Sequence, residues 1–162
     1  MTTRYLEYLE RYPARPRPTT LRHLAAALRT TPAVEKLMPA RCRRLIAPGG
    51  VGRFAFVTST GPVVLLVNFA FVDATIVVRA AEGTVIDGHG DGPVGFEVDH
   101  IGDALGQGWS VLVRGQAHHV RDPAELNRMR QDATVWPWPG GEREMYLRIV
   151  PDRITGRRAE AR

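Results

Sequence analysis

The pattern of apolar and polar residues divides this chain of 162 residues near residue 50. Before that point apolar residues recur at helical spacing: Leu21, Leu24 and Leu28 fall at i, i+3 and i+7, after a threonine pair that can cap a helix. After it, apolar and polar residues alternate with a period of two, which is typical of strands with one buried face. The pattern therefore predicts a helical N-terminal section followed by a β domain.

Prolines mark the starts of several of the predicted helices. Pro32 and Pro39 suit the first turn of a helix, because the fixed φ of proline is preorganised there and its missing N–H has no partner to lose. Asp122 can cap a later helix by accepting a backbone N–H. The helices predicted in this way cover residues 1–12, 19–30, 31–38, 39–46 and 124–130, with an extended linker at 14–18.

Six segments have the composition and alternation of strands, separated by tight turns and glycine-rich loops. They cover residues 51–58, 62–72, 75–80, 93–100, 109–120 and 143–151. Short strands at close spacing with few helices predict a mainly β fold, a six-stranded antiparallel barrel with flanking helices. Strand–helix alternation is missing, as are G-x-G-x-x-G and G-x-x-x-x-G-K-[ST], which argues against nucleotide binding of those two kinds.

Cysteine content and hydropathy indicate the compartment. The single cysteine, Cys42, cannot form an internal disulfide, which suits a reducing cytosol. The longest apolar run, residues 62–72, is interrupted by Asn68 and is too short to cross a membrane. Residues 1–12 carry charges throughout and lack the apolar centre of a signal peptide. We expect a cytoplasmic protein without a membrane segment.

The net charge of +5 is unevenly distributed. Residues 1–48 hold ten Arg and Lys against three Asp and Glu, residues 49–152 hold eight against thirteen, and residues 153–162 hold four against one. A basic arm on an acidic body could contact nucleic acid. The arm lacks interleaved aromatic residues and a DNA-reading motif, so we favour a solvated basic helix that pairs with the body or with a second subunit.

One arginine ends an apolar strand in the stretch VVRAAEGTVID. Arg79 there is either a solvated strand end or the ligand of an anion, most plausibly a phosphate. A guanidinium can meet two phosphate oxygens at once, and a glycine beside a hydroxyl lets backbone N–H groups approach a third. On other strands, we expect Arg53 to pair with a carboxylate such as Glu97 or to contact a cofactor. Asn68 needs a partner in its strand, either backbone or the edge of a ligand.

The histidines do not predict a metal site. His118 and His119 are neighbours on a strand, so their side chains point to opposite faces, and we expect one to be exposed and the other to pack or hydrogen-bond. His89 with Asp87 and Asp91 could form a weak metal site, but a flexible polar loop is the favoured interpretation.

Several blocks, in order, resemble the pyridoxamine 5′-phosphate oxidase-like proteins of the FMN-binding split-barrel superfamily. They include ARCRRLI, GGVGRFAFV, PVVLLVNFAFVDATIVVRA, GPVGFEVDHI and GWSVLVRGQAHHVRDPAEL. The resemblance covers residues 39–158, which leaves residues 1–38 as a basic helical extension and 159–162 as a tail. It implies a homodimer with a flavin, FMN, in each of two clefts at the dimer interface.

The resemblance also implies which residues hold the flavin. Arg79 and the hydroxyl of Thr84 would bind the phosphate, and Val85 stands where relatives usually carry a lysine. The ring would lie along the 67–69 strand and near the G-W-S-V block. The cofactor-binding residues implied in this way are Val67, Asn68, Phe69, Arg79, Thr84, Val85, Trp109 and Ser110.

The function implied is that of an oxidoreductase or reductase whose substrate the sequence does not specify. No catalytic acid, base or nucleophile is indicated, which is compatible with flavin chemistry, because the cofactor carries the reaction. The substrate-phosphate residues and C-terminal block of the vitamin B6 oxidase itself are not visible. Two alternatives stay open: a deazaflavin-dependent reductase, and a non-catalytic barrel without cofactor that serves as a binding module.

Overall fold

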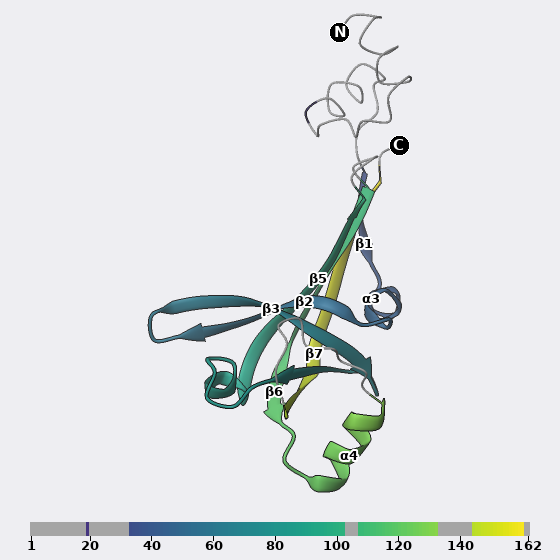
Figure 1. The fold of residues 1–162 in the computed structure, drawn as a ribbon. Coiled ribbons are helices and arrows are strands. Elements are labelled where there is room, and N and C mark those ends of the chain that lie inside the picture. The colour runs from purple at the N-terminus through teal and green to yellow at the C-terminus, as the bar shows by residue number, and fades with distance from the viewer. Residues whose placement is uncertain (1–18, 20–32, 103–106, 133–143, 161–162) are drawn as a thin grey trace, which may run out of the picture. The chain divides into compact units, whose positions relative to one another are not determined.

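A computed structural model describes residue 19 and residues 33–102, 107–132 and 144–160 (Figure 1). The chain divides into two compact units. Of the described residues, 36–99, 110–132 and 144–156 belong to the larger unit, and 33–35, 100–102, 107–109 and 157–160 belong to the smaller. The helices predicted at 1–12 and 19–30 lie outside the described residues, apart from Thr19, and remain predictions.

The described chain is dominated by strands (Figure 1). In chain order the elements are β1 (Ala33–Leu37), α3 (Pro39–Ile46), β2 (Gly50–Thr58), β3 (Gly61–Val72), β4 (Thr75–Ala80), the short 3-10 helix η1 (Asp87–His89), β5 (Gly92–Gly102), β6 (Gln107–His119), α4 (Pro123–Asp132) and β7 (Met145–Glu160). The predicted helices at 39–46 and 124–130, and the six predicted strands, are confirmed.

Six strands close into a ring. The sheet order is β1-β7-β4-β3-β2-β5-β6, and an additional pairing of β7 with β6 joins the ends of the six-stranded part. The ladders β2–β3, β2–β5, β3–β4 and β4–β7 are antiparallel. This confirms the predicted antiparallel barrel. No helix among the described residues is long and apolar enough to cross a membrane.

The helix predicted at 31–38 is wrong, because residues 33–37 form the strand β1, which lies beside β7 in the sheet. A helix this short depends on tertiary packing for its stability. Of Val34, Glu35, Lys36 and Leu37, only Leu37 is buried. Pairing with β7 provides backbone hydrogen bonds that such a helix would have made internally. The sheet environment therefore overrides the weak local preference of these residues for a helix.

Two groups of buried side chains lie on opposite faces of the sheet. Inside the ring, Phe69 meets Phe96 edge-on, with ring centroids 5.2 Å apart. Outside it, Val77 of β4 and Tyr146 of β7 pack with Val120 and Met129. α4 therefore covers the outer face of β4 and β7.

The helix α4 begins, and the strand β3 turns into β4, where the sequence predicts. The backbone N–H of Glu125 donates to Asp122 Oδ1 over 2.8 Å, which confirms the predicted cap. Asp73 and Ala74 have φ angles of 48° and 60°, the left-handed values that a two-residue hairpin turn requires. The return strand β4 therefore lies beside β3 in a fixed register, from Phe69 opposite Val78 to Val72 opposite Thr75.

Candidate functional site

Arg79 lies at the end of β4 with its side chain on the outer face of the ring. Tyr146 is its cross-strand partner on β7, and the Arg79 guanidinium carbon lies 5.2 Å from the centre of the Tyr146 ring. Arg79 Nη2 is 3.9 Å from Glu144 Oε1, and Arg130 Nη2, from α4, is 3.0 Å from Glu144 Oε2. Two guanidinium groups from different elements therefore face one carboxylate.

Of the three β3 residues predicted to line the flavin ring, only Asn68 presents its side chain to the outer face of the barrel. The side chains of Val67 and Phe69 are buried and point into the interior of the barrel. Asn68 pairs with Val51 of β2 and lies one residue beyond the last β3–β4 pair, Phe69 with Val78. Continuing that register by one step puts Asn68 opposite Arg79. These two side chains therefore occupy adjacent positions on neighbouring strands, and Val67 and Phe69 could meet a ligand there only through backbone groups.

The loop after β4 is folded by its own hydrogen bonds. The Thr84 hydroxyl donates to the Ala81 carbonyl over 2.8 Å, and the Gly83 N–H donates to Asp87 Oδ2 over 2.8 Å, with Gly83 at φ 72°. Val85 is 47% exposed and bears no charge. The loop thus holds the Thr84 hydroxyl in a defined turn after the strand that ends in Arg79.

His119 ties this loop to β6. Its Nδ1 lies 2.8 Å from Asp91 Oδ2 and its Nε2 lies 3.0 Å from Asp87 Oδ1, while its backbone N–H donates to Asp91 Oδ1 over 2.9 Å. The two ring nitrogens therefore face carboxylate oxygens of two different aspartates. His119 is largely buried and His118 is exposed. This confirms that one of the two histidines packs and hydrogen-bonds while the other faces solvent.

His89 lies in the same loop as Asp87 and Asp91 but does not face these two aspartates. His89 stacks on Phe56 with ring centroids 4.6 Å apart, and its Nδ1 lies 2.9 Å from the Val85 carbonyl oxygen. Among the described residues, no group of three or more His, Cys, Asp or Glu side chains could hold a metal ion. Asp87 and Asp91 instead hold His119.

The hydrogen bonds of Asp87 and Asp91 lower the pKa values of both carboxyl groups. The His119 backbone N–H, and then its ring, lower the pKa of Asp91 to about 2. The Gly83 N–H, and then His119, lower the pKa of Asp87 below its usual value. Arg121 adds to both effects, and its Nη2 lies 3.1 Å from Asp91 Oδ2. Both carboxylates are therefore held ionised at neutral pH.

Lowering the pH should destabilise this loop over a pH range that the pKa of Asp91 sets. Because folding lowers the pKa of Asp91 from an unfolded value of about 3.9, the ionised carboxylate stabilises the fold above about pH 4, and that stabilisation is lost as the pH falls towards 2. We expect Asp91→Asn to have a lower Tm than the wild type at pH 6, with the difference shrinking towards pH 2. Glu82→Gln, in the same loop, is the control. Parallel profiles of the wild type and Asp91→Asn would contradict the assignment.

Arg53 forms the ion pair that its strand position suggested. Its Nη1 lies 2.7 Å from Glu97 Oε2 and also contacts Asp99 Oδ1. Asp99 and then Glu97 raise the pKa of Arg53. The pairing with Glu97 is confirmed, and Arg53 faces two carboxylates of β5.

The two remaining predicted residues fall in different compact units. Trp109 belongs to the smaller unit, where it stacks on His100 with ring centroids 6.3 Å apart. Ser110 belongs to the larger unit, and its carbonyl oxygen lies 3.0 Å from where a Cβ on Gly156 of β7 would sit. Their proximity to a cofactor remains a prediction.

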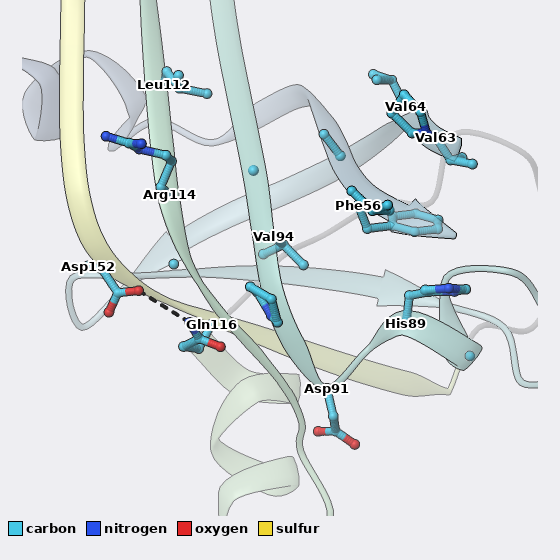
Figure 2. Close-up of a pocket in the computed structure, with 17 residues that line it drawn as sticks. Phe56, Val63, Val64, His89, Asp91, Val94, Leu112, Arg114, Gln116 and Asp152 are labelled. Atoms are coloured by element: carbon cyan, nitrogen blue, oxygen red, sulfur yellow. Dashed lines mark hydrogen bonds between the residues drawn. The ribbon is translucent and has the colours of Figure 1, made fainter. Parts of the chain in front are cut away.

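A cavity of about 710 Å³ lies on another part of the larger unit (Figure 2). Figure 2 shows Arg114, Gln116 and Asp152 on one side of it and Phe56, Val63 and Val64 on the other, with Val94 between them. Gln116 Nε2 donates to Asp152 Oδ2 over 3.4 Å. None of the eight residues predicted to bind a cofactor lines this cavity, and sequence reasoning did not find it. The signal available was the alternation that turns Leu112, Arg114 and Gln116 to one face of β6.

The fold is thus a barrel of six antiparallel strands with an outward-facing arginine near the end of β4. Comparisons with known proteins identify the family to which such a chain belongs. A family model described as pyridoxamine 5′-phosphate oxidase matches residues 39–158. This chain belongs to that pyridoxamine 5′-phosphate oxidase-like family, which confirms the resemblance seen in the sequence.

Solved structures share the fold. The FAD-binding protein of Mycobacterium smegmatis is 31% identical, with 78% of this chain and 98% of that chain covered and a TM-score of 0.65. A candidate pyridoxamine 5′-phosphate oxidase of Corynebacterium glutamicum is 30% identical, with 77% and 92% covered and a TM-score of 0.66. Among sequence relatives, an uncharacterized protein of Mycobacterium tuberculosis is 29% identical over 124 residues, 73% of this chain and 80% of its own.

Proposed function

We propose that this protein binds a flavin, FMN in the first instance, with the flavin phosphate at Arg79, and acts as a cytoplasmic oxidoreductase. The observation that carries the proposal is the pair of guanidinium groups, from Arg79 and Arg130, that face the Glu144 carboxylate on the outer face of the barrel. A carboxylate, itself an oxyanion, already lies at the position where we propose that the phosphate binds. The FAD-binding relative at 31% identity supports a flavin.

The residues present fit the phosphate end of a flavin. Arg79 is 23% exposed and lies against Tyr146, so its guanidinium is positioned before a ligand arrives. A guanidinium and a phosphate form a charge-assisted, bidentate pair. The Thr84 hydroxyl follows in the loop after the same strand, and Asn68, on the neighbouring strand, can offer its amide to the edge of the ring. When bound, a flavin supplies the electron-transfer chemistry, and these residues bind and orient it.

The proposal includes a homodimer with the site at the interface. Several large apolar side chains point outward from ring strands and are exposed: Val51, Val57, Val64, Leu66, Leu112 and Val150. Val64 and Leu66 lie two positions apart on one face of β3, and exposed apolar patches mark interaction surfaces in many proteins. A second copy of the chain is the partner that the family resemblance implies, and it would cover such side chains.

Titration of the purified protein with flavins tests the proposal. We expect FMN fluorescence to be quenched on binding and the Tm to rise with FMN concentration. Parallel titrations use FAD, riboflavin and a deazaflavin cofactor. Binding of the deazaflavin alone would favour a deazaflavin-dependent reductase. If none of the four binds at high excess, the flavin proposal is wrong and a non-catalytic binding module is the better description.

Adding the missing cation should strengthen the site. Val85→Lys places an ammonium in the loop after Arg79, and a charge-assisted hydrogen bond contributes about 1.5–3 kcal/mol, so FMN affinity should rise by about one to two orders of magnitude. Val34→Lys, at another exposed valine, on β1, is the control for the added charge. Equal affinity of the Val85→Lys protein and the wild type for FMN would count against a phosphate beside this loop.

A further inference from the structure

Glu144 lies between two arginines that come from different parts of the fold. Arg79 is the next-to-last residue of β4, and Arg130 lies in the last turn of α4. Each guanidinium faces a different oxygen of the Glu144 carboxylate, at 3.9 and 3.0 Å. The oxygens of a phosphate are spaced much as those of a carboxylate are. The Glu144 carboxylate therefore occupies the kind of position that a phosphate takes between two guanidinium groups.

The helix that carries Arg130 is held in place by the core beneath it. Met129, the preceding residue, is buried against Val77 and Tyr146 on the outer face of β4 and β7. Tyr146 is also the residue on which the Arg79 guanidinium rests. Since one packed cluster supports both side chains, the distance between the two positive charges is set by the fold.

Charge favours exchange of the carboxylate for a phosphate. The Glu144 carboxylate brings one negative charge to the two guanidinium groups, whereas a phosphate monoester carries about −1.5 to −2 at neutral pH. Glu144 and Arg130 are 64% and 50% exposed, so their ion pair contributes little to folding, and displacing the carboxylate costs little.

We propose that Arg130 is the second cation of the phosphate site, in place of the lysine that Val85 replaces, and that Glu144 is an internal anion which the phosphate displaces. This inference rests on the proposed flavin function. It assigns a phosphate-binding role to a helix outside the loop that follows β4. It also makes FMN affinity depend on competition with the carboxylate of the chain itself.

The test compares FMN with riboflavin, which lacks the phosphate, in fluorescence titrations of four variants. Arg130→Gln should weaken FMN binding about tenfold and leave riboflavin binding unchanged, and Arg130→Lys should lose less. Glu144→Gln should tighten FMN binding severalfold without affecting riboflavin. Arg128→Gln is the matched control, because residue 128 lies two positions earlier on α4 and points elsewhere. The three side chains replaced in these four variants are exposed, so an unchanged Tm should accompany each result.

The variants test the roles of Arg130 and Glu144 separately, and the wild type tests the flavin function. Equal FMN affinities of Arg130→Gln and Arg128→Gln would overturn the role of Arg130, and weaker or unchanged FMN binding by Glu144→Gln would overturn the role of Glu144. In both cases, wild-type protein that still prefers FMN to riboflavin would leave the flavin function standing. If the wild type binds neither flavin, the proposed function itself fails, and this inference fails with it.

Discussion

Arg79→Gln should weaken FMN binding by about one to two orders of magnitude while leaving riboflavin binding unchanged. Glutamine keeps a hydrogen-bonding amide but removes the charge and the fork that meets two phosphate oxygens. The guanidinium lies against Tyr146 and faces the Glu144 carboxylate, so the native side chain is already oriented for an oxyanion. Isothermal titration with each flavin would measure both affinities.

A second arginine provides the comparison that locates the phosphate. Arg114 lines the cavity of about 710 Å³ on β6, away from the predicted cofactor residues. We expect Arg114→Gln to leave the preference for FMN over riboflavin intact. If Arg114→Gln removes that preference and Arg79→Gln does not, the phosphate binds in the cavity, and the assignment to Arg79 is wrong.

Gly115→Ala should destabilise the barrel by about 3 kcal/mol or more, the upper part of the range for overpacking. A Cβ at this position of β6 would lie 2.1 Å from the Val150 carbonyl oxygen and 2.9 Å from its carbonyl carbon. Backbone atoms of a paired strand cannot rotate away as a side chain can, so β6 and β7 must separate. These are the strands whose pairing closes the ring.

Denaturant unfolding of the variant and of a matched glycine would measure this effect. At Gly95 on β5, an added Cβ would meet the Ala55 Cβ at 3.6 Å, which is ordinary van der Waals contact. Gly95→Ala should therefore change the free energy of unfolding far less than Gly115→Ala. If the two variants unfold at the same denaturant concentration, the close approach of β6 to β7 is contradicted.

Local pattern was enough to predict most strands and both described helices. The alternation of β2 put Phe54 and Phe56 inside the ring, and Asp122 capped α4 as expected. β1 was missed because its five residues have no strong period, and its conformation depends on β7, which is distant in the sequence. Closure of the ring by β6 and β7 is likewise a long-range pairing that no local pattern contains.

The candidate site was predictable only where its parts are close in sequence. Arg79, Thr84 and the glycine between them formed a recognisable stretch. Glu144 lies between Arg79 and Arg130 only because β7 pairs with β4 and α4 packs on the outer face of both strands, so neither residue could be found from spacing. The same holds for His119, which reaches the loop aspartates from β6.

A crystal structure of the protein grown with FMN would test the central claim most directly. We predict that the phosphate lies within hydrogen-bonding distance of the Arg79 guanidinium, with the Glu144 carboxylate displaced and the flavin ring along β3 near Asn68. A phosphate bound elsewhere, for example beside Arg114, or protein that stays free of flavin at saturating FMN, would contradict it.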